Sequence, residues 1–340
     1  MLVYMKNKAP FLTQVIGKLA PRVGAKLVVE PHWQYAAQIQ FKNGVKKYLR
    51  FYSLDLNTVA ASDIARDKGF ARFFMKRAGY PVAEGKTFFK DSWAKTIGSR
   101  DNVSAALTYA KKLGYPVIAK PNSRSQGTGV TLAHNAQELR TALAFIFTED
   151  KVAIVEEYRP GSDYRIVVLD GKVISAYERQ PLSVIGDGVS TIAQLLKKKQ
   201  SYFTAVARDT KVDFADPRML AKLRRQKLSL KSVVPKGKKI VLLDNANLSD
   251  GGDSVDVTET MHSGFRTLAI SLAREMGLRM AGIDLMIEKG SIDKTPVKNG
   301  YYIIEINATP GLDHYASTGK KQKKIVEDMY LEILKAMAKK

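Results

Sequence analysis

Three oxygen-bearing side chains near the C-terminal end of the chain have the types and spacing of a cation site. Asp284 lies in the apolar run 282–287, and Glu305 and Asn307 lie in the run 301–307. Side chains alternate between the faces of a strand, so Asp284 points away from its apolar neighbours while Glu305 and Asn307 share a face. If the two strands pair, three oxygen ligands converge, and a hard cation such as Mg²⁺ would neutralise the buried carboxylates. The alternative is a solvated face on which both carboxylates pair with lysines.

A loop of small residues, 122–129, follows a compact apolar strand that ends at Lys120. Gly127 and Gly129 permit a turn whose backbone amides can approach phosphate oxygens, and Lys120 adds a positive charge beside it. The loop is not a Walker A loop, because no Gly-Lys-Ser/Thr sequence closes it. It also lacks the three-glycine spacing of a Rossmann loop. An ordinary connecting loop is the alternative interpretation.

The composition excludes several kinds of site. The chain has 340 residues, of which 45% are apolar and 26% charged, as in globular proteins. Without cysteine it can form neither disulfides nor thiolate metal sites, and its four histidines are far apart in sequence, which argues against a zinc site. The first residues lack the pattern of a signal peptide and no apolar run reaches membrane-spanning length, so we expect a cytoplasmic protein.

The net charge of +22 is the one unusual feature of the composition. Such an excess of positive charge attracts anions, and nucleotides, acidic peptides and nucleic acids all fit. The alternative is a solvated basic surface. No recognisable nucleic-acid motif accompanies the basic runs, so we do not expect nucleic acid as a partner.

The order of expected strands and helices predicts an α+β fold and not a regular βαβ array. Residues 1–60 form a small β-rich element, with a hairpin at Asn43-Gly44. Residues 62–79 are predicted to form one helix, with Ser62 or Asp63 as its cap. A basic, mostly helical insertion near residues 190–235 is expected to interrupt the strand pattern.

Ten segments of the chain resemble the ATP-grasp superfamily and occur in the family's order over roughly residues 60–315. The resemblance is greatest to the ATP-grasp modules of cyanophycin synthetases and bifunctional glutathione synthetases. The segments are 65–68, 79–82, 115–121, 155–158, 161–165, 186–192, 245–252, 255–258, 281–284 and 304–311. The resemblance implies two α+β lobes that clasp ATP, 61–157 with the glycine loop and 158–340. It also implies an ADP-forming carboxylate–amine ligase that makes an amide through an acyl-phosphate.

The resemblance also implies roles for individual residues, with ATP and Mg²⁺ as cofactors. Residues that would bind ATP are Lys68 and Lys120 at the phosphates, Ser125, Gly127 and Gly129 in the closing loop, Glu156, Glu157 and Tyr158 at the adenine, and Asp163 at the ribose. Asp284, Glu305 and Asn307 would bind the metal, and Arg165, Arg179 and Asn247 are the catalytic candidates. Simpler roles are a surface lysine for Lys68, a turn former for Asp163, and pairing with neighbouring carboxylates for the two arginines.

The sequence departs from the family pattern in two places. Leu243-Asp244 precede Asn245 where the cyanophycin-type pattern has an arginine two residues before this asparagine. A positive group near the phosphates is therefore missing or comes from elsewhere. Residues 312–319 are also unlike the family forms, and they either shape the substrate pocket or simply connect two elements.

These departures leave alternative functions open. The chain could be an ATP-binding protein without ligase activity, such as a regulatory or partner subunit. A kinase-like enzyme would need only a different acceptor oxygen. For a ligase, the substrate class is an amino acid or a peptide, and the positive charge favours an acidic one. The sequence identifies neither the acid nor the amine. It also leaves open whether the chain forms a homo-oligomer.

Overall fold

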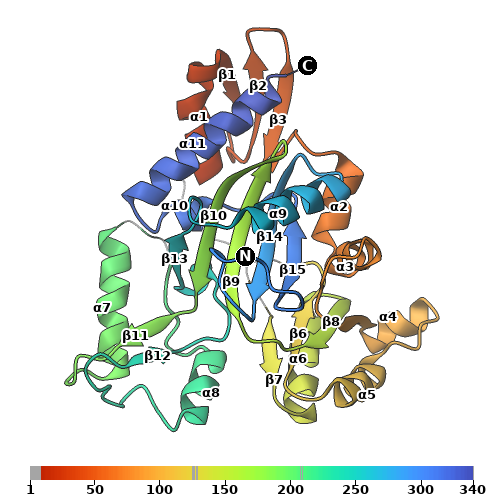
Figure 1. Cartoon of the computed structure of the whole chain (residues 1–340), viewed down its shortest axis with the longest axis vertical. Coiled ribbons are helices and arrows are strands. Elements are labelled where there is room, and N and C mark those ends of the chain that lie inside the picture. The colour runs from red at the N-terminus through yellow and green to blue at the C-terminus, as the bar shows by residue number, and fades with distance from the viewer. Residues whose placement is uncertain (1–8, 125–126, 128, 207, 209, 340) are drawn as a thin grey trace.

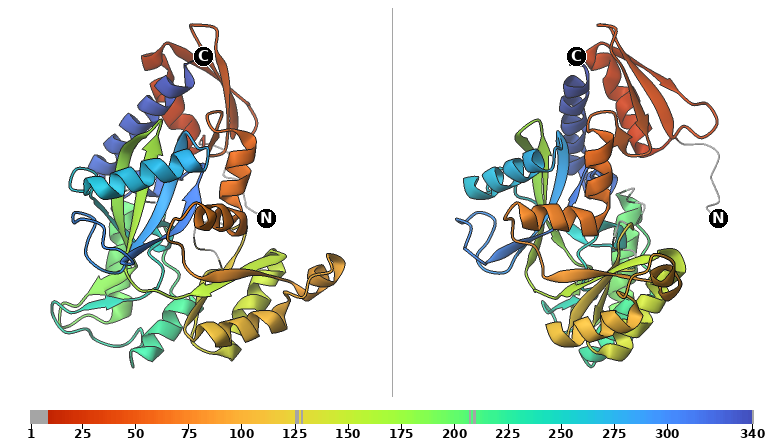
Figure 2. Two further views of the ribbon diagram at one scale, coloured as in Figure 1. Left: turned by 45° about the vertical axis from the view of Figure 1, so that its right-hand side comes forward. Right: turned by 90° about the vertical axis from the view of Figure 1, so that its right-hand side faces the viewer.

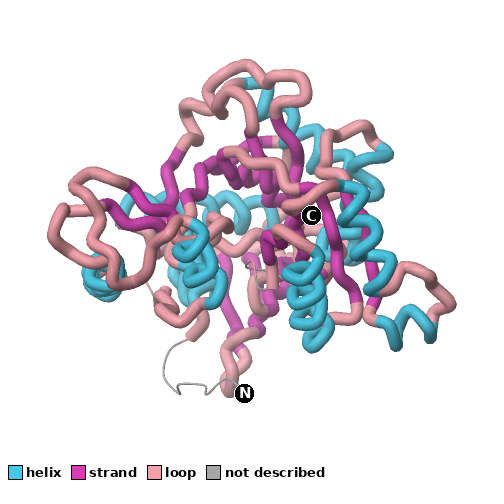
Figure 3. The backbone as a smooth tube through the Cα atoms, turned by 90° about the horizontal axis from the view of Figure 1, so that it is seen from below, coloured by secondary structure: helices cyan, strands magenta, loops and turns pink. Residues whose placement is uncertain are grey.

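The computed structural model describes residues 9–339 except 125, 126, 128, 207 and 209. It confirms the α+β class, because antiparallel sheets and helices alternate irregularly along the chain (Figure 1). Seen from below, helices lie on both sides of the strands (Figure 3). Within the described residues, no helix is both long enough and apolar enough to cross a membrane.

A five-stranded antiparallel sheet forms the centre of the molecule (Figure 1). Its strands, in spatial order, are β13 (Asp253–Asp256), β10 (Lys172–Gln180), β9 (Ser162–Leu169), β14 (Met280–Ile287) and β15 (Tyr301–Asn307). Helix α9 (Ser263–Glu275) covers one face, where its apolar side chains share a core with alternate residues of β9 and β14. The opposite face carries the polar residues that the sequence singled out.

Strands β9 and β10 are joined by a turn of only two residues, which brings them together as an antiparallel hairpin. Asp170 and Gly171 join the two strands and both have positive φ, 44° and 75°. This backbone matches the twist of a two-residue hairpin. The hairpin predicted at Asn43-Gly44 is also confirmed, because the strands on either side of it, β2 and β3, pair with each other.

A second antiparallel sheet lies below the first in Figure 1. Its strands, in spatial order, are β5 (Gly85–Phe89), β8 (Val152–Glu157), β6 (Val117–Pro121) and β7 (Thr131–Ala133). Helices α5 (Val103–Leu113) and α6 (Ala136–Glu149) share a hydrophobic core with it, and α4 (Asp91–Thr96) precedes them. The glycine loop joins β6 to β7 and so leaves this sheet at its Lys120 end.

The N-terminal element stands at one end of the molecule, against the last helix (Figure 2). It consists of α1 (Phe11–Leu19), the 3₁₀ turn η1 (Ala20–Val23), β1 (Ala25–Val29), β2 (Ala36–Phe41), β3 (Lys46–Arg50) and β4 (Ser53–Leu54). Its core is completed by α10 (Asp313–Ala316) and α11 (Lys320–Met337). The element therefore combines segments from the two ends of the sequence.

The basic insertion has a hydrophobic core of its own. It contains β11 (Ser183–Ile185), α7 (Ile192–Ala205), α8 (Pro217–Arg225) and β12 (Lys239–Val241), and the turn η2 (Leu248–Asp250) follows it. Thr191 and Gln194 cap the start of α7 reciprocally. The boundaries proposed at residues 60 and 157 stay predictions.

The prediction of one helix over residues 62–79 is wrong. The chain forms α2 (Val59–Arg66) and α3 (Lys68–Arg77), separated by Asp67 with extended backbone angles (φ −85°, ψ 104°). The Asp67 carboxylate accepts a hydrogen bond from the Phe70 N–H, so it caps the second helix. This break makes Lys68 the first residue of α3.

Candidate active site

Four charged side chains, all largely shielded from solvent, form a network on the face of the central sheet opposite α9. Arg165 on β9 lies opposite Asp284 on β14, and Arg179 on β10 lies opposite Asp163 on β9. Arg165 donates from Nε and Nη2 to Asp284, the latter at 2.9 Å to Oδ2. Arg179 Nη2 donates both to Asp163 Oδ1 at 2.6 Å and to Asp284 Oδ2 at 2.9 Å. Asp284 therefore joins both arginines.

The network is fixed by strand register, not by flexible surface contacts. Asp284 is 3% exposed, which excludes the solvated face considered for it from sequence. Burial alone would lower the pKa of Arg179, but Asp163 and Asp284 outweigh this effect and raise it, so the guanidinium stays charged. The simpler role considered for Arg165 and Arg179, pairing with carboxylates on neighbouring strands, is what the structure shows for both.

Glu305 and Asn307 extend this face onto the next strand. The pairing of β14 with β15, which the cation site requires, is present, with Asp284 opposite Glu305 and Gly282 opposite Asn307. Asn307 Nδ2 donates to Glu305 Oε1 at 2.9 Å, and Lys68 Nζ lies 3.6 Å from Glu305 Oε2. Lys68 thus reaches this strand from a segment far away in sequence.

The chemistry of these residues fits a hard cation. Burial would raise the pKa of Glu305, but Lys68, the Asn307 amide, Arg165 and Lys120 together lower it to about 2. The carboxylate is therefore ionised at neutral pH, and every candidate ligand supplies oxygen. Among the described residues no three acidic or histidine side chains gather as a metal cluster. A cation site on this face would thus require the Asn307 amide oxygen beside Glu305 and Asp284.

Lys120 and Glu156 form a buried ion pair on the second sheet. Their side chains come from the neighbouring strands β6 and β8, and Lys120 Nζ lies 2.5 Å from Glu156 Oε1. Only 7% and 10% of the two side chains are exposed. The family resemblance implies phosphate binding for Lys120 and adenine binding for Glu156. The structure places the two side chains in contact, and both roles stay predictions.

Among the residues expected to bind adenine, Glu157 already uses its main-chain N–H in a hydrogen bond within the protein. The Glu157 N–H donates to the Glu84 carbonyl at 2.8 Å, and its carboxylate accepts from the Glu84 N–H at 2.9 Å. Tyr158, the next residue, is 38% exposed. The main-chain N–H of Glu157 is thus already paired, and the adenine-binding roles stay predictions.

The described part of the glycine loop lies against the asparagine-rich run. A Cβ atom built on Gly127, whose φ is +68°, would stand 1.7 Å from Asn247 Nδ2. The same Asn247 nitrogen is buried, and no described residue forms a hydrogen bond with it. An unpaired buried donor beside a glycine loop suits an acceptor-rich ligand such as a phosphate. Gly129 lies against Pro121, and Ser125 is outside the described residues.

The residues that hold the asparagine-rich run in place were not predicted from the sequence. Arg208 is buried and donates to the carbonyl oxygens of Leu248 and Gly252. From α8, Lys222 contacts Asp244, while Arg218 reaches Asp250 at 3.3 Å. The basic composition of α8 was the available signal. The helix thus brings positive charge to the position where the family arginine is absent.

Residues 312–319 do more than connect two elements. Tyr315 stacks on Tyr177 of β10 with ring centroids 4.1 Å apart, and Asp313 accepts a hydrogen bond from Tyr52 of the N-terminal element at 2.6 Å. Tyr177 lies opposite Arg165 on the site face. This segment therefore borders the arginine network and links it to the N-terminal element.

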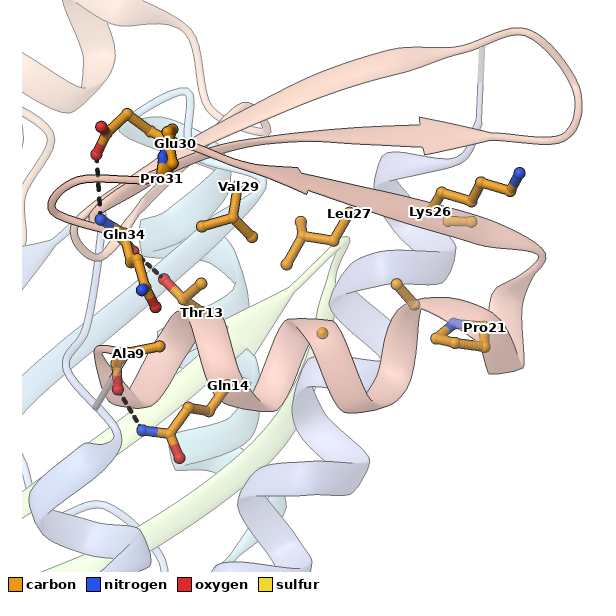
Figure 4. A pocket seen from close by; sticks show the side chains of 13 residues that line it. Ala9, Thr13, Gln14, Pro21, Lys26, Leu27, Val29, Glu30, Pro31 and Gln34 are labelled. Atoms are coloured by element: carbon orange, nitrogen blue, oxygen red, sulfur yellow. Dashed lines mark hydrogen bonds between the residues drawn. The ribbon is translucent and has the colours of Figure 1, made fainter. Parts of the chain in front are cut away.

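A surface groove of about 690 Å³ lies elsewhere, between α1 and β1 (Figure 4). Leu27 and Val29 form one wall, and Thr13 and Gln14 lie along the other. No candidate site residue lines it.

Two family models match this chain. Residues 74–191 match the model described as the D-Ala–D-Ala ligase C-terminus, and residues 244–329 match the RimK-like ATP-grasp domain. The chain belongs to the ATP-grasp superfamily. The first match contains Lys120, Glu156 and the two arginines, and the second contains Asn247 and the three metal candidates. Lys68 lies outside both ATP-grasp matches.

Curated relatives include the glutathione biosynthesis bifunctional protein GshAB of two streptococci. The Streptococcus mutans protein is 33% identical over 257 residues, which are 72% of this chain and 32% of the relative. The Streptococcus thermophilus protein is 31% identical over 287 residues, 79% of this chain and 36% of the relative. The chain thus spans about a third of the length of these relatives.

A solved structure supports the ATP-grasp fold. The bifunctional glutathione synthetase from Pasteurella multocida matches with a TM-score of 0.59 and 22% identity, over 96% of this chain and 44% of that chain. At this identity the likeness concerns the fold.

Proposed function

We propose that this ATP-grasp chain is an ADP-forming carboxylate–amine ligase that makes an amide bond through an acyl-phosphate. In this reaction a substrate carboxylate attacks the γ-phosphorus of ATP, and ADP leaves. The amine then attacks the activated carbonyl carbon, phosphate leaves, and the amine loses a proton. The relatives named as glutathione biosynthesis proteins support this reaction class.

One observation carries the proposal. Lys68, at the start of α3, comes within 3.6 Å of Glu305, which adjoins the buried Arg165–Asp284 pair on one sheet face. Cationic groups and ionised oxygen donors thus meet at one place, as transfer of a phosphoryl group between oxygens requires.

The roles of the individual residues follow from their charges and positions. Lys68 and Lys120 would neutralise phosphate oxygens, and Arg165 and Arg179 would steady the phosphoryl group or the acyl-phosphate. Asp284, Glu305 and Asn307 would hold Mg²⁺, which would neutralise phosphate charge when bound. The glycine loop, with Gly127 against Asn247, would limit the access of water to the acyl-phosphate.

The substrate class follows from charge. With a net charge of +22 the chain attracts anions, and an amino acid or an acidic peptide supplies both a carboxylate and an amine. We propose an acidic peptide or amino acid as the substrate that becomes phosphorylated.

A second candidate is an ATP-binding protein without ligase activity. Two observations favour it, namely Asp244 next to the position of the family arginine and the engagement of both Asp284 oxygens by arginines. Binding of Mg-ATP without turnover on any substrate would support this candidate.

The test is ADP release measured over panels of acids paired with amines, including acidic peptides. We expect ADP to form only when both an acid and an amine are present, together with a product whose mass is that of the amide. Glu305→Ala should abolish the signal, whereas Glu332→Ala, which removes an exposed carboxylate on α11, should leave it unchanged. Release of ADP with a phosphorylated acceptor as final product would instead identify a kinase.

A further inference from the structure

Asn122, the residue at the start of the glycine loop, makes three hydrogen bonds that connect the loop to α3 and to its own sheet. Its Oδ1 accepts from the Gly69 N–H at 2.9 Å, and its Nδ2 donates to Asp67 Oδ2 at 2.7 Å. Its own N–H donates to the Val152 carbonyl at 3.0 Å, on the strand β8. Asn122 is only 6% exposed, so these bonds are protected from water.

The two residues that Asn122 contacts on α3 stand on either side of Lys68. Asp67 is the N-cap and Gly69 the second residue of the helix, so Asn122 holds the backbone of the first turn. The position of Gly69 has little freedom, because a Cβ there would stand 2.9 Å from Thr87 Oγ1. The direction in which the Lys68 side chain leaves the helix is therefore set by this pair of contacts.

The same loop also receives the end of the Lys68 side chain. Its ammonium donates to the Arg124 carbonyl at 2.5 Å and lies 3.6 Å from Glu305. The loop is in turn fixed to its own sheet, because Ser123 donates from N and Oγ to Asp150 at 3.0 and 2.6 Å. Helix α3 belongs to the core of the central sheet, whereas Val152 lies on the second sheet. Asn122 thus joins the two sheets at Lys68.

We infer that the Asp67–Asn122 pair is a positioning clamp, which holds Lys68 at the place where it binds the phosphates of ATP. The inference rests on the proposed function, since it assigns Lys68 to the nucleotide. In the proposed clamp, Asn122 does not touch the phosphates of ATP and acts on them only through Lys68.

An exchange of the two side chains tests the clamp. Asn122→Asp puts two carboxylates in contact and should weaken Mg-ATP binding about tenfold. Asp67→Asn is milder, because asparagine is an equally good helix cap. In the double variant Asp67→Asn/Asn122→Asp, the new amide donates to the new carboxylate, and the Gly69 and Phe70 N–H groups keep their acceptors. We expect Mg-ATP affinity within about threefold of the original chain in this double variant.

The Lys68→Met background separates positioning from general stabilisation. If the clamp acts through Lys68, Asn122→Asp should change Mg-ATP affinity no further once Lys68 is replaced. A matched control is Asn135→Asp, which also sets an aspartate beside a carboxylate at a helix N-terminus, because Asn135 caps α6 and contacts Glu138. This control should leave Mg-ATP affinity unchanged. Calorimetric titration with Mg-ATP measures affinity, and circular dichroism verifies that each variant is folded.

The outcomes distinguish the clamp from the proposed function. If the original chain binds Mg-ATP and Asn122→Asp and Asp67→Asn bind it equally well, the clamp is wrong and the nucleotide site stands. The clamp is also wrong if Asn122→Asp weakens binding as much in the Lys68→Met background as in the original chain, or if the exchange fails to restore affinity in a folded protein. If the original chain binds no Mg-ATP, the proposed function fails and the clamp fails with it.

Discussion

At the scale of single residues, Lys120 and Glu156 have both a structural and a functional interpretation. The pair is buried at 2.5 Å, so each charge compensates the other. We expect Lys120→Ala to lower the free energy of unfolding by about 3–5 kcal/mol, because it leaves Glu156 buried without a partner. The double variant Lys120→Met/Glu156→Gln should recover most of that stability in urea unfolding and still release no ADP. Turnover by the double variant would show that Lys120 is purely structural.

Glu305 gives a prediction on pH dependence. Its pKa is lowered from 4.5 to about 2 in the folded chain, so between these values the unfolded state binds the proton more readily. The carboxylate therefore contributes stability, of the order of 3 kcal/mol, that is fully present above about pH 5 and is lost as pH falls toward 2.

Urea unfolding of the original chain and of Glu305→Gln tests this between pH 3 and 7. The difference in unfolding free energy should be constant from pH 7 to 5 and should shrink below pH 4.5. A difference that grows as the pH falls would contradict the direction of the shift.

At the scale of elements, the glycine loop and the asparagine-rich run must fit against each other. Gly127→Ala places a methyl group against Asn247 Nδ2 and strains a backbone with positive φ. Gly44→Ala carries the same backbone strain at φ +85° but meets nothing within 4 Å. We expect both to lose about 1 kcal/mol of stability, and only Gly127→Ala to weaken Mg-ATP binding. Equal Mg-ATP affinities for the two variants would contradict the prediction that nucleotide binding needs the close contact between Gly127 and Asn247.

Element patterns also determine what the sequence could reveal. Alternation along 282–287 and 301–307 placed Asp284 and Glu305 on neighbouring strands, because a strand has a fixed period of two. The hairpin at Asn43-Gly44 followed from local turn chemistry.

Local sequence patterns do not predict contacts that depend on strand register or on long-range packing. The Arg179–Asp284 pair depends on the alignment of β10, β9 and β14, which no local pattern states. The break at Asp67 was missed because helical periodicity continues across it, and the cap is recognisable only by its bond to Phe70. The role of Asn122 needs its contact with Gly69, which lies 53 residues away.

At the scale of the whole molecule, the net charge of +22 gives a prediction on how anionic substrates reach the proposed site. For an acidic peptide we expect KM to rise several-fold between about 20 and 200 mM salt, because the Debye length falls below the dimensions of the site. The KM for an uncharged amine should change little over the same range, and steady-state ADP release measures both. Equal salt dependence for the two substrates would indicate that the charge is only a solvated surface.

The N-terminal element and the last helix share one hydrophobic core, and Lys18 meets Glu327 across a separation of 309 residues. During synthesis the first helix leaves the ribosome long before its partner has been made. At about 5–20 residues per second the wait lasts roughly 15–60 s, and throughout it the apolar face of α1, which includes Leu12 and Ile16, lacks the neighbours that α11 supplies. The nascent chain therefore has a defined interval in which chaperones can bind the segment from α1 to β4, and this interval ends when α11 emerges.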